Sequence, residues 1–158
     1  MSATSGRLLA GMALASFAAV AVALVAQHAY DMQPCPWCIL QRVIFIVIAL
    51  LCGVGALVAS RGLRAGVAGA VLLLAASGAA AALWQHFVAA KSASCNLTLA
   101  DRIIGALGLE ALLPAFFQVT ASCADAVSTI ARVPFEFWSL ALFVVLGLAA
   151  AAVLSGRR

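Results

Sequence analysis

The chain has 158 residues, of which 66% are hydrophobic and only 9% are Asp, Glu, Lys or Arg. A soluble domain carries about 25% charged residues, so these charges are too few to cover a surface that faces water, and the mean hydropathy of +1.19 agrees. The net charge of +4 does not indicate nucleic-acid binding, because the basic residues stand singly at the edges of apolar runs. The composition therefore excludes a soluble domain and predicts a membrane protein.

Four apolar runs approach the roughly 20 residues that a helix needs to cross the hydrocarbon core of a bilayer: 8–27, 39–59, 65–87 and 135–154. Each is expected to be a helix, because an open strand would leave its backbone groups unpaired in lipid. We therefore predict an all-α polytopic membrane protein, a single four-transmembrane-helix bundle over residues 1–158 with outer loops at 28–38 and 88–134. A cleaved signal peptide is the alternative for the first run, which is too long for such a peptide and lacks a clear cleavage site.

The distribution of charge predicts the orientation of this bundle. An even number of spans places both termini and the turn after the second span on one side of the membrane. That side carries Arg7, Arg61, Arg64, Arg157 and Arg158. All acidic residues fall on the other side: Asp31, Asp101, Glu110, Asp125 and Glu136. Since basic residues collect on the cytoplasmic side, both termini are expected to be cytoplasmic and both longer loops to face outward.

The third span is rich in small residues, among them Gly66, Gly69, Ser77 and Gly78. Small residues let helices approach one another closely, so this span is expected to pack against its neighbours. A lipid-facing helix that happens to be rich in Ala and Gly is the alternative.

The first outer loop ends on a closely spaced cysteine pair, Cys35 and Cys38. A disulfide between them would close a very short ring, which constrains an unfolded chain poorly. The same spacing is typical of exchangeable dithiols, in which one thiolate attacks and its neighbour resolves. Cys38 also falls in the first turn of the second predicted helix, where the free N–H groups and the helix dipole favour a thiolate. The pair is therefore predicted to be redox-active.

Arg42 lies four residues after Cys38, on the same face of the predicted helix. A guanidinium at this depth is costly unless it has a partner. It can stabilise negative charge on Cys38 or on a carbonyl oxygen of a reducible ligand, and snorkelling to the membrane surface is the alternative. We predict Arg42 to be a ligand-binding residue.

The second outer loop contains Cys95 and Cys123, far apart in the sequence. Between them, Thr98 and Asp101 have the spacing of a capping box, and apolar residues follow at helical intervals, which predicts a short amphipathic helix on the membrane surface. A structural disulfide is the alternative for this pair. However, the nine residues from His86 to Cys95 reach about 30 Å when extended, so the second pair can contact both Cys35 and a soluble partner.

Other reactive side chains receive less specific interpretations. Zinc sites usually combine two close cysteine pairs, so no metal is predicted for the four loop cysteines with His28 and His86. Cys52 lies in the middle of the second span and is expected to act as a small hydrophobic side chain. His86 stands at the outer end of the third span. We expect it to have a function only if a ligand binds between the helices.

These features resemble the disulfide bond formation protein B (DsbB) family. The resemblance rests on four spans, on the run Cys35-Pro36-Trp37-Cys38-Ile39-Leu40-Gln41-Arg42 at the start of the second span, and on the second cysteine pair. Trp138-Ser139-Leu140 at the start of the last span is also similar. The resemblance covers nearly the whole chain, and this combination is far more specific than Cys-x-x-Cys alone.

The resemblance implies an enzyme of the bacterial inner membrane that reoxidises a periplasmic thioredoxin-like dithiol protein of the DsbA type and passes the electrons to ubiquinone or menaquinone. It implies that Cys95 forms a mixed disulfide with the partner, that Cys123 resolves it, and that Cys35 receives the electrons. It further implies that Cys38 and Arg42 lie at the quinone, with His86 nearby.

Two rival functions follow from the same residues. A relative of vitamin K epoxide reductase also uses Cys-x-x-Cys and a quinone, but its motif is expected late in the bundle. A non-catalytic membrane scaffold with two structural disulfides would have an inert Cys35–Cys38 pair and would bind no quinone.

Overall fold

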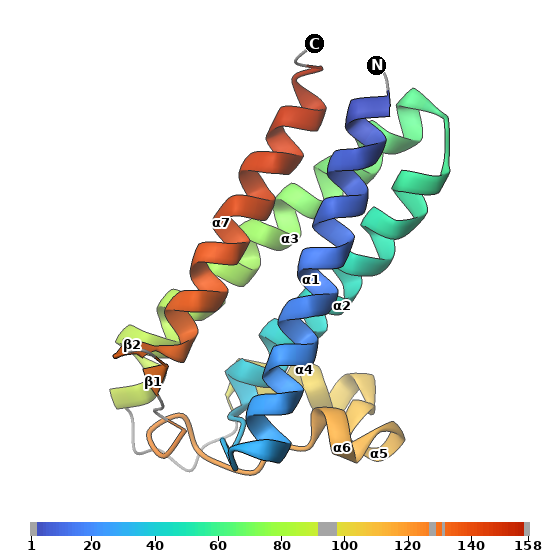
Figure 1. Cartoon of the computed structure of the whole chain (residues 1–158). Coiled ribbons are helices and arrows are strands. Elements are labelled where there is room, and N and C mark those ends of the chain that lie inside the picture. The colour runs from blue at the N-terminus through green and yellow to red at the C-terminus, as the bar shows by residue number, and fades with distance from the viewer. Residues whose placement is uncertain (1–2, 92–97, 127–128, 131, 157–158) are drawn as a thin grey trace.

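The computed structural model describes residues 3–91, 98–126, 129–130 and 132–156. Four helices in this part of the chain are long and apolar enough to cross a membrane, which confirms the predicted fold class. They form an elongated bundle, with the two termini at one end and the cysteine-bearing loops at the other (Figure 1). The four are α1 (Ala3–Ala29), α2 (Pro36–Leu57), α3 (Arg61–Phe87) and α7 (Phe135–Leu154).

Three of the helices, α1, α2 and α3, begin before the predicted apolar runs, whereas α2 ends earlier than predicted, at Leu57, and α7 has the predicted bounds. Helix α1 begins at Ala3, and α3 begins at Arg61, directly after Ser60, whose side chain accepts a hydrogen bond from the N–H of Leu63. Apolar runs mark the segment that suits hydrocarbon, whereas a helix continues into polar residues until a cap or a proline ends it.

The bundle consists of two principal helix pairs, α1 with α2 and α3 with α7, and contacts between α2 and α3 join the pairs. Helix α1 packs chiefly on α2, α7 chiefly on α3, and α2 contacts α3. In the core, the ring of Phe143 on α7 stacks on Phe45 of α2, with 4.1 Å between ring centroids. Any Cβ placed on Gly78 of α3 would collide with Phe143. Gly66 and Gly69 meet open space instead, so close approach of helices depends on one of these glycines and not on the whole small-residue stretch.

Short elements fill the second loop at the cysteine-bearing end. They are η1 (Ala89–Lys91), α4 (Leu99–Leu107), α5 (Leu109–Leu112), α6 (Pro114–Phe117), β1 (Thr129–Ile130) and β2 (Val133–Pro134). The predicted capping box at the start of α4 is present, with Thr98 and Asp101 bonded reciprocally. Gly108 adopts φ +62° and ends α4, which is why the apolar repeat does not continue as one helix.

The loop is attached to the bundle through a small apolar cluster. Ile39 of α2 packs with Ile104 of α4 and Phe117 of α6, and all three side chains are buried. Figure 1 shows α4, α5 and α6 gathered beside the ends of α1 and α2. The two-stranded antiparallel ribbon of β1 and β2 leads directly into α7.

Candidate active site

The first cysteine of the close pair caps the second helix. Cys35 is the N-cap of α2, with φ −89° and ψ 167°, and Pro36 occupies the first helical turn. The sulfur of Cys35 accepts a hydrogen bond from the N–H of Cys38 across 3.3 Å. An N-cap side chain normally bonds the N–H two or three residues later, so a thiol here takes the place usually filled by Ser or Asp.

The two sulfurs of this pair are in direct contact. Sγ of Cys35 lies 2.6 Å from Sγ of Cys38, and both cysteines are free thiols. A disulfide has an S–S distance of about 2.05 Å, so the two sulfurs are placed for a disulfide that forms when an oxidant removes two electrons and two protons are released. Cys35 is fully buried, so its sulfur contacts only other protein groups.

Cys123 reaches the same site from the second loop. Its sulfur lies in one buried cluster with Cys35 and Trp37, close enough for Cys35 and Cys123 to shift each other's pKa. The segment before it is tied to the first loop, because the N–H groups of Thr120 and Ala121 both donate to the carbonyl of Pro34, at 3.1 and 3.3 Å. The length of the second loop permits a contact between its cysteines and Cys35. The structure brings Cys123 to Cys35.

The proton of this contact belongs to Cys35. Hydrogen bonds to Cys123 and then to Cys38, together with burial, raise the pKa of Cys35 above its ordinary value. The hydrogen bond from Cys35 lowers the pKa of Cys123, although burial opposes this. When both cysteines are reduced, Cys35 therefore holds its proton more firmly than Cys123 does.

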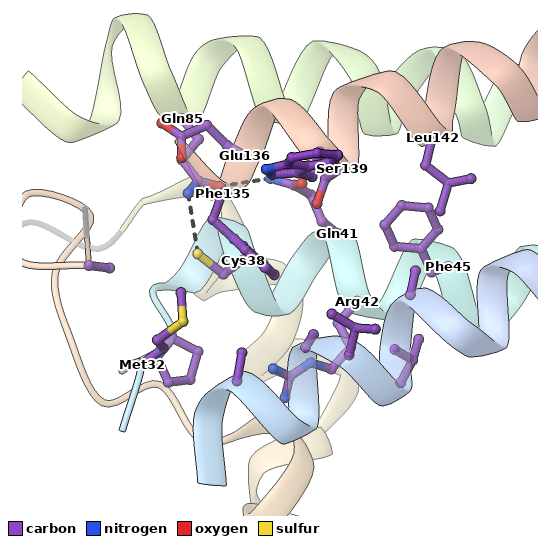
Figure 2. A pocket seen from close by; sticks show the side chains of 18 of the residues that line it. Met32, Cys38, Gln41, Arg42, Phe45, Gln85, Phe135, Glu136, Ser139 and Leu142 are labelled. Carbon is purple, nitrogen blue, oxygen red and sulfur yellow. Dashed lines mark hydrogen bonds between the residues drawn. The ribbon is translucent and has the colours of Figure 1, made fainter. Parts of the chain in front are cut away.

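A hydrogen-bond chain of two buried glutamines leads to Cys38 (Figure 2). Nε2 of Gln85 on α3 donates to the sulfur of Cys38 at 3.2 Å. Nε2 of Gln41 on α2 in turn donates to Oε1 of Gln85 at 2.7 Å, which fixes the orientation of the second amide. Both glutamines are buried. Within the cysteine pair, the amide of Gln85 therefore donates to the sulfur of Cys38 and not to that of Cys35.

A cavity of about 200 Å³ opens beside Cys38. Helices α1, α2, α3 and α7, the first loop and the segment after Cys123 contribute to its wall. Figure 2 shows most of the lining side chains around one hollow. They are Ala19, Val20, Val22, Ala23, Ala26, Met32, Gln33, Pro34, Cys38, Gln41, Arg42, Phe45, Gln85, Ala126, Phe135, Glu136, Trp138, Ser139 and Leu142. The wall is mostly apolar, with a few polar groups near Cys38.

Arg42 lines this cavity and is only 5% exposed. Its Nη1 donates to Oε1 of Gln27 at 2.9 Å and to the carbonyl of Phe116. The guanidinium interacts electrostatically with Cys38, while its hydrogen bonds anchor α1 and α6. Its Nε is buried and has no hydrogen-bond partner among the described residues. Arg42 therefore places a positively charged side chain on the wall of the cavity.

His86 is not among the residues that line the cavity; it contacts one that does. Its Nδ1 shares a hydrogen bond with Oε1 of Glu136 at 2.7 Å, and Glu136 lies in the first turn of α7. The imidazole also meets the rings of Phe87 and Phe137 edge-on. His86 thus approaches the site through Glu136.

Sequence reasoning missed Gln41, Gln85 and Glu136. Each is a polar residue within a predominantly apolar span, which is a signal for function in membrane proteins, and Gln41 and Gln85 directly precede Arg42 and His86. Cys95 lies outside the described residues, so its pairing and role stay predictions. Cys52 is fully buried in the main hydrophobic cluster of the bundle.

The fold and this site define a class: a multi-pass membrane protein with a buried dithiol at one end of a four-helix bundle. Residues 5–153 match the family model described as "Disulfide bond formation protein DsbB". The chain belongs to this DsbB family, and its function is disulfide bond formation.

Individual relatives agree with the family match. The chain is 35% identical over 141 residues to "Disulfide bond formation protein B" of Herminiimonas arsenicoxydans, which covers 89% of each chain. It is 33% identical over 153 residues to the protein of the same name from Polaromonas naphthalenivorans (strain CJ2), covering 94% of this chain and 90% of the relative. "Disulfide bond formation protein B 1" of Pseudomonas syringae pv. syringae (strain B728a) is 33% identical over 156 residues, covering 96% and 91%.

Proposed function

We propose that this protein oxidises a periplasmic thioredoxin-like dithiol protein of the DsbA type and passes the electrons to a membrane quinone. The observation that carries the proposal is the position of Cys35 between two sulfurs, Cys38 and Cys123. A cysteine with two sulfur neighbours can exchange its disulfide partner without a large movement of the backbone. A scaffold with two inert disulfides has no need for this contact.

The thiol steps balance as exchanges of one disulfide for another. The reduced partner attacks the Cys95–Cys123 disulfide and leaves as an oxidised protein, and Cys95 and Cys123 become thiols. The Cys123 thiolate then attacks Cys35 of the Cys35–Cys38 disulfide, which forms a Cys35–Cys123 bond and releases Cys38 as a thiolate. Attack of Cys95 on Cys123 restores the Cys95–Cys123 disulfide and frees Cys35.

The released Cys38 faces the cavity, which fits a quinone ring. A cavity of about 150 Å³ lined by apolar side chains binds benzene, so about 200 Å³ admits a substituted six-membered ring. The positive charge of Arg42 on the cavity wall suits a carbonyl oxygen of that ring. A bound quinone, either ubiquinone or menaquinone, supplies an acceptor for two electrons and two protons. Gln85 and Arg42 stabilise negative charge on Cys38 until the Cys35–Cys38 bond re-forms.

The proposal includes the bacterial inner membrane, with both termini in the cytoplasm and the cysteine-bearing loops in the periplasm. Support comes from Arg7, Arg61 and Arg64 at the terminal end of the bundle and from the acidic residues at the opposite end (Figure 1), since basic residues collect on the cytoplasmic side. In this orientation, Cys123 lies on the side where a secreted dithiol protein is found, and Cys38 faces a cavity between membrane helices.

The test is quinone reduction by the purified full-length protein. A reduced thioredoxin-fold dithiol protein is added with ubiquinone-1, and quinone absorbance is followed. We expect reduction to stop when Cys35 or Cys38 is replaced by Ser, and to continue at the unaltered rate in Cys52→Ser, the matched control. Quinone reduction that survives replacement of both Cys35 and Cys38 would refute the proposal, and complete inactivity of the unaltered protein would favour the scaffold.

A further inference from the structure

Glu136 is a carboxyl group buried at the wall of the cavity. It is 7% exposed, stands in the first turn of α7, and lines the same hollow as Cys38 and Arg42 (Figure 2). It is close enough to Cys38 for the two charges to repel. An ionisable residue in a membrane span is costly and is usually retained for a function with a specific partner, so this carboxyl group requires an explanation.

The proposed reaction, on which this inference rests, needs a proton that the cysteines do not supply. Cys35 and Cys38 lose two electrons when their disulfide re-forms, and the acceptor takes those electrons with two protons. The Cys35 thiol releases one proton, whereas Cys38, as a thiolate, releases none. The second proton must therefore enter the cavity from another group.

Among the described residues that line the cavity, three have ionisable side chains: Cys38, Arg42 and Glu136. Cys38 donates electrons, and arginine stays protonated in proteins. Glu136 is therefore the lining side chain that can gain and lose a proton.

His86 lies between Glu136 and the molecular surface at the outer end of α3. The Nδ1–Oε1 distance of 2.7 Å allows direct proton transfer along the hydrogen bond. The side chain of His86 is 31% exposed, against 7% for Glu136, and it lies next to the end of α3 at the cysteine-bearing end of the bundle. Imidazole is the side chain that exchanges protons near neutral pH, so the pair spans the distance between solvent and the cavity wall.

We propose that Glu136 and His86 form the proton path into the cavity. As the Cys35–Cys38 disulfide closes, Glu136 donates one proton into the cavity and becomes a carboxylate. It then takes a proton from His86, which is reprotonated from water on the outer side. Two electrons from the thiols, one proton from Cys35 and one from Glu136 balance the reduction of one quinone.

Infrared difference spectroscopy tests the protonation change directly. The full-length protein is reduced with dithiothreitol and then oxidised with ubiquinone-1, and the C=O stretch of a protonated carboxyl is followed. With time resolution during this oxidation, we expect a carboxyl signal that falls as Glu136 donates its proton and recovers as His86 returns one; the signal is missing in Glu136→Gln and persists in Glu110→Gln, an exposed glutamate on α5 that serves as the control. Absence of the signal in the unaltered protein, or its persistence in Glu136→Gln, would overturn the proposal.

Single-turnover kinetics give the second measurement. Protein with pre-reduced Cys35 and Cys38 is mixed with ubiquinone-1 over a range of pH. General acid catalysis contributes about a hundredfold or more, so Glu136→Gln is expected to slow reduction about a hundredfold and to remove the decline of the rate with rising pH. His86→Gln is expected to change the pH profile in the same direction, whereas Glu136→Asp keeps a titratable group and restores part of the rate.

The outcomes separate this inference from the proposed function. If the unaltered protein does not reduce ubiquinone-1, the proposed function fails. If it does, and Glu136→Gln matches its rate and pH profile, the proton path alone is wrong. The proton path is also wrong if Glu136→Gln only weakens ubiquinone-1 binding with an unchanged pH profile, since a structural α3–α7 contact would behave in that way.

Discussion

The amide of Gln85 donates a hydrogen bond to the sulfur of Cys38 across 3.2 Å, and that sulfur lies on the wall of the cavity. A hydrogen bond to a charged group contributes about 1.5–3 kcal/mol, so this bond favours the thiolate of Cys38 over the thiol. Reactivity at Cys38 should therefore depend on a residue from a different helix.

Gln85→Leu removes that donor at similar volume. In a protein that keeps Cys38 as its single cysteine, we expect iodoacetamide to alkylate Cys38 about tenfold more slowly at pH 7, because a loss of ~1.5 kcal/mol lowers the thiolate population about tenfold. Gln118→Leu, at an exposed position of the second loop, is the control. Equal rates in both variants would show that Gln85 does not stabilise the thiolate.

Cys35→Ala tests the electrostatics of the contact with Cys123. Cys35 lowers the pKa of Cys123 by donating a hydrogen bond, so the Cys123 thiolate persists to lower pH while Cys35 is present. Removing the donor should raise the pKa of Cys123 and move the pH midpoint of its alkylation upward, as measured by mass spectrometry of the reduced protein. Cys52→Ala, which alters a buried thiol far along α2, should leave the midpoint unchanged. A midpoint that stays in place in Cys35→Ala contradicts the contact.

Arg42→Ala should weaken quinone binding, because the Arg42 side chain lines the cavity and carries a positive charge. Loss of one charged hydrogen bond of about 1.5–3 kcal/mol corresponds to roughly 10- to 150-fold in affinity. Titration with ubiquinone-1, followed by tryptophan fluorescence, measures the change. Arg102→Ala, an exposed arginine of α4, is the matched control. An unchanged dissociation constant for Arg42→Ala would remove Arg42 from the site.

Gly78→Ala should destabilise the bundle, because a Cβ at Gly78 collides with the ring of Phe143. Overpacking of this kind costs about 1–3 kcal/mol. Gly69→Ala on the same helix meets open space and should be neutral or slightly stabilising. Thermal unfolding in detergent compares the two, and equal midpoints would mean that α3 and α7 separate easily at this position.

Much of the architecture follows from the sequence, because the bilayer imposes strong constraints on composition. The four spans follow from apolar length, and the start of α4 follows from the capping box at Thr98 and Asp101. The break at Gly108 has a local signal too, since glycine favours positive φ, but the apolar periodicity on either side obscured it.

The site was only partly predictable, because contacts between helices are not encoded in spacing. Helical spacing placed Cys38 and Arg42 on one face of α2, and both line the cavity. Spacing could not reveal that Arg42 bonds Gln27 and Phe116, which come from other elements. Likewise, the His86–Glu136 pair joins α3 to α7 across 50 residues of sequence, and only the packed bundle brings the two together.

The central claim is that Cys35 exchanges its disulfide partner between Cys38 and Cys123, and disulfide mapping of a Cys38→Ser variant tests it most directly. With Cys38 absent, Cys35 should pair with Cys123, and non-reducing digestion with mass spectrometry should recover the two peptides linked in most molecules. Recovery of Cys35 as a free thiol in protein that has been oxidised by air, with Cys123 bonded solely to Cys95, would contradict the claim.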